Sequence, residues 1–355
     1  MDLRIKDRPF VIAGPCSAET REQVLETALG LQNLPIDLLR AGVWKPRTRP
    51  GNFEGVGEEG IAWLKEAGEL IGKPITVEVA NAAHAETALK GGVDVLWIGA
   101  RTTVNPFMVQ EIADSLKGVE VPVLVKNPVN PDVELWIGAI ERFQAVGLRS
   151  IGAIHRGFST FQKSPFRNSP NWNIPIELRR RMPDLPIICD PSHICGNREL
   201  LAEVAQKAID LNMDGLMLET HRDPLKAWSD ADQQVTPAEL NRILSELVWR
   251  SPESKNMEVL AKLEELRHTI DGLDRDILDL LNDRLAVSRK IGEYKRSHNI
   301  TILQHQRWNE ILEDRKAHIE GKEISLRFLH RFLDAIHEES IRQQTEVMNA
   351  KKANQ

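Results

Sequence analysis

The sequence lacks three features that would assign the protein to a special class. Three cysteines in 355 residues are too few for a disulfide scaffold, and they suit a reducing compartment, so we expect a cytoplasmic location. No apolar run is long enough to span a membrane, and the first residues lack the apolar core of a signal peptide. The formal net charge of −6 argues against a general nucleic-acid binder, which needs a basic surface. We therefore expect neither a membrane nor a nucleic acid as a partner.

What the first 250 residues contain is a series of short apolar runs separated by amphipathic segments. The runs are rich in Val, Ile and Leu without strict alternation, as in parallel strands that are buried on both faces. They lie at 10–16, 36–44, 74–80, 94–100, 122–127, 150–155, 186–192 and 215–221. Strand–helix alternation repeated in this way predicts a (β/α)8 TIM barrel over residues 1–250, with a doubly wound open sheet as the alternative.

The pattern changes after the polar segment 251–256, which we interpret as a linker. From 257 to 355 the strand signals stop and apolar residues recur at three-to-four spacing, which predicts an all-helical domain. We expect one helix from Met257 to about His298 and two more at roughly 301–320 and 325–349. At 1.5 Å per residue the first would be about 60 Å long. Three helices of such unequal length cannot cover its apolar stripe, so we expect a homodimer.

Groups that bind metals follow several of the predicted strands. In a barrel of this kind the chemistry lies at the carboxyl ends of the strands. The candidate ligands there are Cys16, His193, Glu219 and either Asp230 or its rival Asp232. A thiolate, an imidazole and carboxylates suit a divalent ion such as Mn²⁺, Fe²⁺, Co²⁺ or Zn²⁺. Cys189 is expected in the core, and the place of Cys195 stays open.

Cations form a second group at the same strand ends. They are Arg40, Lys45, Arg47, Arg101, Lys126 and Arg156. A single Arg or Lys usually lies solvated on a surface, but six on one rim would repel one another unless they bind anions. The implied substrates are small, carry phosphate, and include a carboxylate.

These residues lie in motifs that resemble one family. GPCS (14–17), KPRT (45–48), GAR (99–101), VKNP (125–128), HRG (155–157), CDPSH (189–193), ETH (219–221) and SD (229–230) resemble the 3-deoxy-D-arabino-heptulosonate 7-phosphate (DAHP) synthases over about residues 1–250. The related octulosonate phosphate synthases typically have Lys-Ala-Asn-Arg in place of KPRT. The start of the chain so close to the first strand resembles the short form of the family, without an N-terminal regulatory extension.

The resemblance implies a role for each matched residue. The metal ligands would be Cys16, His193, Glu219 and Asp230, with Mn²⁺ as the first choice of metal. Phosphoenolpyruvate would be held by Arg40, Lys45, Arg101, Lys126, Arg156 and the Ala100 amide. Arg47 and Thr48 would bind the phosphate of erythrose 4-phosphate. The implied reaction is an aldol-like condensation in which the methylene carbon of phosphoenolpyruvate attacks the aldehyde, water adds to the neighbouring carbon, and phosphate leaves.

Charges also interrupt the helical stripe of the second domain. Arg284 and Lys295 are eleven residues apart, so they share a helix face about 16 Å apart and both can reach one small dianion. Arg267 lies about 25 Å before Arg284, so it can join that site only from a partner chain. Ser340 and Gln344 follow Ile336 on an apolar face and need polar partners. A dimerising coiled coil with solvated charges is the alternative interpretation.

The segment LRHTIDGLDRDILDLLNDRLAVSRKIGEYK resembles the all-helical chorismate mutases, over about 258–349. That resemblance implies that Arg284 and a partner's Arg267 bind the two carboxylates of chorismate. Lys295 and Gln344 would stabilise the ether oxygen during the rearrangement to prephenate. The remaining pocket residues would be Gln304, Arg307 and Ser340. This chain has Trp308 and Gln304 where the family commonly has acidic residues.

We therefore expect a bifunctional enzyme of aromatic biosynthesis, in which the helical domain also gives feedback control by prephenate or chorismate. One alternative is a DAHP synthase whose tail serves only regulation or dimerisation. Another is a synthase of the octulosonate type with a dimerisation tail.

Overall fold

The computed structural model describes residues 3, 5, 8–46, 51, 53–161, 164–250, 254, 256–303 and 305–350, without the side chains of 305 and 306. The chain divides into two compact units, 1–252 and 253–355. Most of the predicted linker at 251–256 lies outside the described residues.

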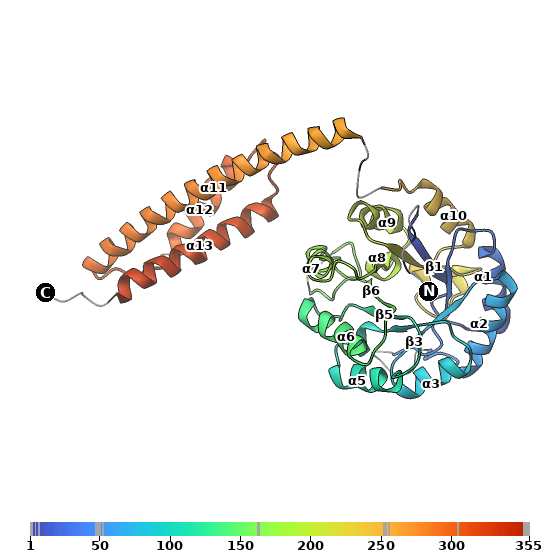
Figure 1. Ribbon diagram of the computed structural model, residues 1–355. Coiled ribbons are helices and arrows are strands. Elements are labelled where there is room, and N and C mark those ends of the chain that lie inside the picture. Colours follow the sequence, from blue (N-terminus) through green and yellow to red (C-terminus); the bar gives the residue numbers. More distant parts are fainter. Residues whose placement is uncertain are drawn as a thin grey trace. The chain divides into compact units, whose positions relative to one another are not determined.

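The first unit is a closed barrel of parallel strands in sequential order, β1 to β8 (Figure 1). The strands are β1 (Phe10–Gly14), β2 (Leu38–Arg40), β3 (Ile75–Val79), β4 (Val95–Ile98), β5 (Val123–Lys126), β6 (Ile151–His155), β7 (Ile187–Cys189) and β8 (Gly215–Glu219). Each lies inside one of the predicted apolar runs, and β8 pairs with β1, so the predicted TIM barrel is confirmed and the open sheet is wrong.

Helices cover the outside of the barrel (Figure 1). They are α1 (Arg21–Leu31), α2 (Glu58–Ile71), α3 (Ala82–Lys90), α4 (Ala100–Thr103), α5 (Pro106–Ser115), α6 (Val133–Ala145), α7 (Asn173–Arg181), α8 (Pro191–Cys195), α9 (Leu201–Asp210) and α10 (Pro237–Glu246), with short 3-10 turns η1 (Pro224–Lys226) and η2 (Ala231–Gln233). Several begin at a side chain that accepts a hydrogen bond from the first turn, as at Thr20, Asn81 and Asp132. These caps start the helices immediately after the loops that follow the strands.

The barrel interior explains why functional side chains collect at one end. Successive strand residues point to opposite faces, so residues two apart share a face. Phe10, Ile12, Leu38, Leu124 and Met217 belong to one buried cluster inside the barrel. In five of the eight strands the inward position two residues further along the chain is polar. Leu38 is followed by Arg40, Leu124 by Lys126, Ile154 by Arg156, Ile188 by Asp190, and Met217 by Glu219.

The second unit consists of three helices, as predicted. They are α11 (Met257–Ser297), α12 (His305–His318) and α13 (Leu326–Asn349). The buried part of α11 is near its end, at Ser288, Gly292 and Lys295, where α13 packs against it. A Cβ on Gly292 would lie 3.1 Å from the Gln344 Cα, so a glycine here permits the close approach of the two helices. A small core forms around Ile319, Leu329 and Leu333.

The first half of α11 has no such cover within its own unit. Its early turns extend beyond α12 and α13 (Figure 1), and the apolar side chains there are exposed. Leu266, Ile270, Leu273 and Ile277 retain 48–57% of their accessible surface. An apolar stripe of this size is typical of a surface that another chain covers. Homodimerisation stays a prediction.

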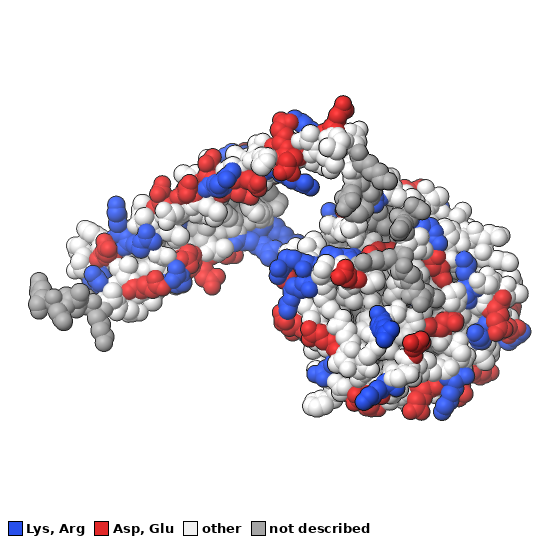
Figure 2. Space-filling view, viewed as in Figure 1, with Lys and Arg blue, Asp and Glu red and all other residues white. Residues whose placement is uncertain are grey.

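Charges of both signs are interspersed on the face that Figure 2 shows, over the barrel and along α11. None of the helices within the described residues combines the length and the apolar character that crossing a bilayer requires.

Candidate functional site

Two buried ion pairs form the floor of the site at the carboxyl ends of the strands. Arg40 Nη2 lies 3.1 Å from Glu219 Oε1, and Lys126 Nζ lies 3.1 Å from Asp190 Oδ2. All four side chains are almost inaccessible to solvent. Burial opposes ionisation of Asp190, but His193 and Lys126 outweigh it and hold its pKa well below the usual range. The floor therefore consists of charged groups that are already paired with one another.

Arg40 nevertheless has hydrogen-bond donors that its ion pair with Glu219 does not use. Its Nε and Nη1 groups are buried and have no hydrogen-bond partner among the described residues. The guanidinium carbon lies 4.9 Å from the centre of the Trp97 ring, and Lys126 Nζ lies 5.7 Å from the same ring. A buried N–H without a partner costs about 1–3 kcal/mol, so such donors are typical of a site that an anion completes.

The remaining predicted cations surround this floor. Arg156 Nη1 donates to Asn168 Oδ1 at 2.7 Å. Burial, together with Arg167 and Arg101 nearby, lowers the pKa of Arg156 to about 10, although Asp190 opposes this shift. Arg101 is more exposed and donates to Pro46 O at 3.0 Å. Ala100 is the first residue of α4, directly after β4. Positive groups thus repel one another at this end of the barrel, which favours a bound anion.

The four candidate ligands come together in two pairs. Cys16 Sγ lies 3.3 Å from Asp230 Oδ2, and His193 Nε2 lies 3.7 Å from Glu219 Oε1. Lys45 connects the pairs. Its Nζ lies 2.9 Å from Cys16 Sγ, and its positive charge interacts electrostatically with both Glu219 and Asp230. Asp232, the rival of Asp230, is exposed. Among the described residues no three His, Cys, Asp or Glu side chains are arranged as a closed metal-binding group.

The donor set still fits a divalent ion in chemical character. Glu219 Oε1 is buried and accepts no hydrogen bond from any described residue, so it is an acceptor that remains available to an ion among the four candidate ligands. His193 presents Nε2 to it, while its Nδ1 lies 2.8 Å from Asp190 Oδ2. A second carboxylate that orients an imidazole ligand is typical of metal sites in proteins. A thiolate sulfur, an imidazole nitrogen and two carboxylates together suit a divalent ion between the hard and the soft metals, such as Mn²⁺, Fe²⁺, Co²⁺ or Zn²⁺.

Protonation at this site depends on burial and on neighbouring charge. Burial and the Glu219 carboxylate raise the pKa of the Cys16 thiol to about 12. A cation must therefore be close by for Cys16 to act as a thiolate ligand. Burial disfavours the Lys45 ammonium, but the attraction of Cys16, when it is a thiolate, and of the Glu219 carboxylate outweighs burial and raises the Lys45 pKa. Lys45 accordingly stays charged at neutral pH.

Two predicted residues, Arg47 and Thr48, lie outside the described residues. Cys189 lies in the core, as expected, and Cys195 belongs to the same apolar cluster. Sequence reasoning missed several residues of the site, Asp190 of the floor among them. The others are Trp97, Arg167, Gln233 and Gln234. Two signals in the sequence point to three of these residues. Trp97 lies inside a predicted strand, and Gln233 and Gln234 follow the SD motif at 229–230.

In the helical unit α11 and α13 supply the predicted pocket residues. Arg284 Nη1 donates to Ser340 Oγ at 2.8 Å, and Gln344 Nε2 donates to Ser288 Oγ at 3.1 Å. Gln344 Oε1 is buried without a hydrogen-bond partner among the described residues. Lys295 Nζ donates to Ile302 O at 2.6 Å. These side chains form a polar patch between α11 and α13, to which Arg289 adds a hydrogen bond to Gln343 Oε1 at 2.9 Å.

The other predicted helical residues are peripheral within one chain. Arg267 is exposed and lies 3.6 Å from Glu264, far along α11 from Arg284. Arg307 pairs with Glu310 at 3.0 Å on the exposed side of α12. Gln304 lies outside the described residues. Trp308 stacks on His337 with ring centroids 4.1 Å apart, so it contributes a ring face rather than a charge.

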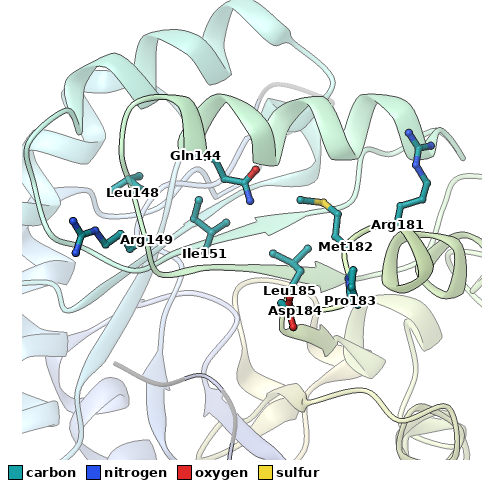
Figure 3. A pocket seen from close by; sticks show the side chains of 9 residues that line it. All are labelled: Gln144, Leu148, Arg149, Ile151, Arg181, Met182, Pro183, Asp184 and Leu185. Carbon is teal, nitrogen blue, oxygen red and sulfur yellow. The ribbon is translucent and has the colours of Figure 1, made fainter.

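A separate cavity of about 370 Å³ lies at the opposite, amino-terminal end of β6 and β7 (Figure 3). Leu148, Ile151 and Leu185 form its apolar floor, while Arg149 and Arg181 stand at its rim. Arg181 is paired with Glu134. No predicted site residue lines this cavity.

A (β/α)8 barrel with buried cations and candidate metal ligands at its catalytic end belongs to the class of enzymes that act on small anions. Residues 5–254 match the DAHP synthetase I family, and residues 266–345 match chorismate mutase type II. The chain belongs to the DAHP synthetase I family, and a chorismate mutase domain follows the synthase domain in the sequence. It is therefore a bifunctional enzyme of the shikimate pathway, both a transferase and an isomerase.

Individual relatives agree with this assignment. A phospho-2-dehydro-3-deoxyheptonate aldolase of Thermotoga maritima is 34% identical over 235 residues, which cover 66% of this chain and 68% of that protein. The crystal structure of the Thermotoga maritima DAHP synthase superposes with a TM-score of 0.61 at 32% identity and covers 67% of each chain. A 2-dehydro-3-deoxyphosphooctonate aldolase of Methylococcus capsulatus is 28% identical over 270 residues, which cover 68% of this chain and 91% of that protein. The family match and the higher identity to the heptonate aldolase, 34% against 28%, favour the DAHP synthase over the octulosonate alternative.

The two families also imply the substrates of the chain. These are phosphoenolpyruvate, erythrose 4-phosphate, and the pair chorismate and prephenate. DAHP synthases are generally metal-dependent.

Proposed function

We propose that the buried donors of Arg40 bind phosphoenolpyruvate at the end of the barrel. The observation that carries this proposal is the pair of unpartnered N–H groups on Arg40, beside Lys126 and above Trp97. Arg101, Arg156 and the Ala100 amide would complete the anion site, because they follow β4 and β6, the two strands that flank β5 and its Lys126. Arg47 and Thr48, in the KPRT motif, would hold the phosphate of erythrose 4-phosphate.

Cys16, His193, Glu219 and Asp230 would hold the divalent ion, with Mn²⁺ as the first choice and Fe²⁺, Co²⁺ or Zn²⁺ as alternatives. When bound, the ion supplies Lewis-acid polarisation of the aldehyde oxygen. Lys45 supplies a second positive charge and a proton beside that oxygen, since its raised pKa keeps it an ammonium. The paired cations of the floor orient phosphoenolpyruvate so that its methylene carbon faces the aldehyde.

We propose that the helical unit binds chorismate between α11 and α13 of one chain and Arg267 of a partner. Arg284 and the partner's Arg267 would bind its two carboxylates, while Arg307, Ser340 and the segment around Gln304 would line the pocket. Lys295 and Gln344 would stabilise the ether oxygen as it gains negative charge. The buried amide oxygen of Gln344 supports this assignment, because an unpartnered amide end indicates a missing ligand, and the two ends of an amide can exchange places.

One assay series on the full-length protein tests both proposals. EDTA should abolish DAHP formation and leave prephenate formation intact, since only the barrel reaction needs a metal. Re-addition of Mn²⁺ should restore DAHP formation. Persistence of DAHP formation in EDTA, after exhaustive dialysis, would contradict the metal site.

Feedback is a further proposal for the helical unit. Prephenate or chorismate bound there would change the affinity of the barrel for its substrates, and the linkage would be reciprocal in binding. The test compares synthase kinetics with and without prephenate in the wild-type chain and in Arg284→Ala. We expect an effect in the wild type that the variant loses; equal kinetics in all four conditions would reject the proposal. The cytoplasmic location predicted from the cysteine content stays a prediction.

A further inference from the structure

Two neighbouring glutamines, Gln233 and Gln234, connect the loop after β8 to the candidate metal ligands. Both side chains are buried, with 1% and 0% of their surface exposed. They follow Asp230, whose φ of 44° lies in the left-handed region that residues other than glycine rarely adopt. A loop in this conformation persists only when surrounding contacts determine it.

Gln233 bridges two of the candidate ligands. Its Nε2 donates to Glu219 Oε2 at 2.6 Å, and its Oε1 accepts from Arg167 Nη1 at 2.9 Å. The same Nη1 donates to Asp230 Oδ1 at 3.0 Å. The amide therefore occupies one oxygen of Glu219 and leaves Oε1 facing His193 and Arg40.

Gln234 links a third ligand to the same loop. Its Oε1 accepts from the Cys16 amide at 2.9 Å, and its Nε2 donates to Ser229 O at 2.9 Å. The side chain thus ties the backbone of Cys16 to the peptide that precedes Asp230. A parallel link joins Ser17 Oγ and Ser229 Oγ at 2.6 Å.

The backbone of the glutamine segment is itself fixed against the barrel. Val235 N donates to Glu219 O at 3.1 Å, and His221 N donates to Val235 O at 2.9 Å, so the segment runs parallel to the end of β8. Arg198 holds its other side by donating to Gln234 O at 2.6 Å. Gln233 is the last residue of η2, whereas Gln234 is extended with φ −85° and ψ 146°, so the backbone changes from helical to extended between them. Gln233 is directed to Glu219 and Gln234 to Cys16.

We propose that Gln233 and Gln234 are positioning residues of the metal centre, which act through Glu219, Cys16 and Asp230 without touching the ion. The inference rests on the metal site proposed above. Each amide uses both its donor and its acceptor, a combination that neither a carboxylate nor an apolar side chain provides. Partners of this kind orient metal ligands, and their loss typically lowers metal affinity about 10- to 100-fold.

The test titrates the full-length, metal-stripped protein with Cd²⁺ and follows ultraviolet absorption by the cadmium–thiolate bond. Cys16→Ser identifies the part of the signal that belongs to Cys16 rather than to the other cysteines. We expect Gln233→Met and Gln234→Met to weaken Cd²⁺ binding about 10- to 100-fold and to reduce the Cys16 band. Gln234→Glu keeps the acceptor for the Cys16 amide but loses the donor to Ser229 O, so its effect should be intermediate.

Gln23→Met is the matched control. Gln23 is also buried, and its amide also bonds two backbone groups of the loop after β1, namely Glu19 N at 3.1 Å and Ser17 O at 3.4 Å. It touches no candidate ligand, so Gln23→Met should lose thermal stability yet bind Cd²⁺ within about threefold of the wild type.

The outcomes separate the inference from the function it rests on. If the wild type shows no Cys16-dependent band, the metal site itself is wrong and the inference falls with it. If the wild type binds Cd²⁺ and the Gln233 and Gln234 variants bind it equally well, or no worse than Gln23→Met, the glutamines are only structural and the inference is overturned. If Gln234→Met does not fold, Gln234→Glu decides by the intermediate weakening expected above. If Gln233→Met does not fold, Gln233→Asn, which keeps the amide but is one methylene too short to reach Glu219, decides in the same way as the methionine variant.

Discussion

The barrel and the helical unit differ in how completely one chain builds its own site. In the barrel, Arg40, Lys126 and Glu219 are all at most 3% exposed, and their ion pairs form within the chain. In the helical unit, Arg284 meets Ser340 within the chain, but Arg267 is exposed and distant along the same helix.

This difference follows from geometry. A closed barrel brings eight strand ends together, so residues far apart in sequence meet at one rim. A helix spreads its residues along an axis, and only neighbours within a few turns can share a ligand. The barrel can therefore complete its site alone, whereas we expect the helical unit to need a second copy. The predictions below test that contrast.

The largest effect is expected from Arg40→Met. Loss of one partner from a buried, hydrogen-bonded charge pair, here Arg40 with the bound phosphoenolpyruvate, costs about 2–5 kcal/mol, which corresponds to about 30- to 4,000-fold in kcat/KM for DAHP synthesis. Mutase activity of the same preparation should not change, since Arg40 belongs to the other unit. Arg242→Met, which removes an exposed arginine from α10, is the control and should retain full synthase activity. Equal loss of both activities in Arg40→Met would indicate unfolding instead.

Mixing two inactive chains should restore mutase activity. Arg267→Ala and Arg284→Ala should each lose most activity alone, because each lacks one carboxylate ligand. If a site takes Arg284 from one chain and Arg267 from its partner, a mixed dimer contains one intact site. Random re-pairing then gives about a quarter of the wild-type activity. The measurement is prephenate formation after mixing and dissociating the two variants, with each unmixed variant as the control. No recovery, despite proven mixed dimers, would contradict the shared site.

A negative charge on the exposed apolar stripe of α11 should lower mutase activity by a smaller factor than the changes above. Ile270→Glu places a carboxylate on the apolar face of α11, where Ile270 is 56% exposed in one chain. Burying that carboxylate in an interface is costly, so we expect a shift toward monomer and at least about a tenfold loss of mutase activity at micromolar protein. Arg275→Glu, on the opposite side of the same helix, is the matched control. Sedimentation velocity reports the assembly, and an unchanged dimer would place the interface elsewhere.

The last expected effect concerns the pH dependence of barrel stability, and it is confined to acid pH. His155 is fully buried beside Trp136, Phe158 and Trp172, and burial lowers its pKa to about 3. The unfolded state therefore binds more protons below pH ~6.5, so the free energy of unfolding should fall as the pH falls. The expected slope from this residue is about 1.4 kcal/mol per pH unit between roughly pH 6 and pH 4. Urea unfolding of the wild type and His155→Phe measures it; equal slopes would contradict a neutral His155.

Much of the barrel could be predicted from the sequence because its strands are buried on both faces. Apolar runs such as 94–100 and 215–221 show where strands lie, but not where they end, and each strand is shorter than its run. The polar residue two places after an inward apolar residue is the informative signal. Arg40 after Leu38 and Glu219 after Met217 illustrate it.

The contacts between loops could not be predicted in the same way. Gln233 and Gln234 come after the motif that carries Asp230, and nothing in their identity says which ligand each one bonds. That information depends on the parallel pairing of Val235 with the end of β8, a contact between segments whose sequences carry no pairing signal. Likewise the stacking of Trp308 on His337 depends on how α12 lies against α13.

The 41-residue length of α11 has a consequence for how this chain can change. One inserted residue between Arg267 and Arg284 would turn the second half of the helix by about 100° against the first. In a pair of chains that exchange Arg267, that single insertion would misalign both catalytic pockets at once. The number of residues between Arg267 and Arg284 fixes both their separation and their relative direction. The segment between them should therefore tolerate substitutions far better than insertions or deletions.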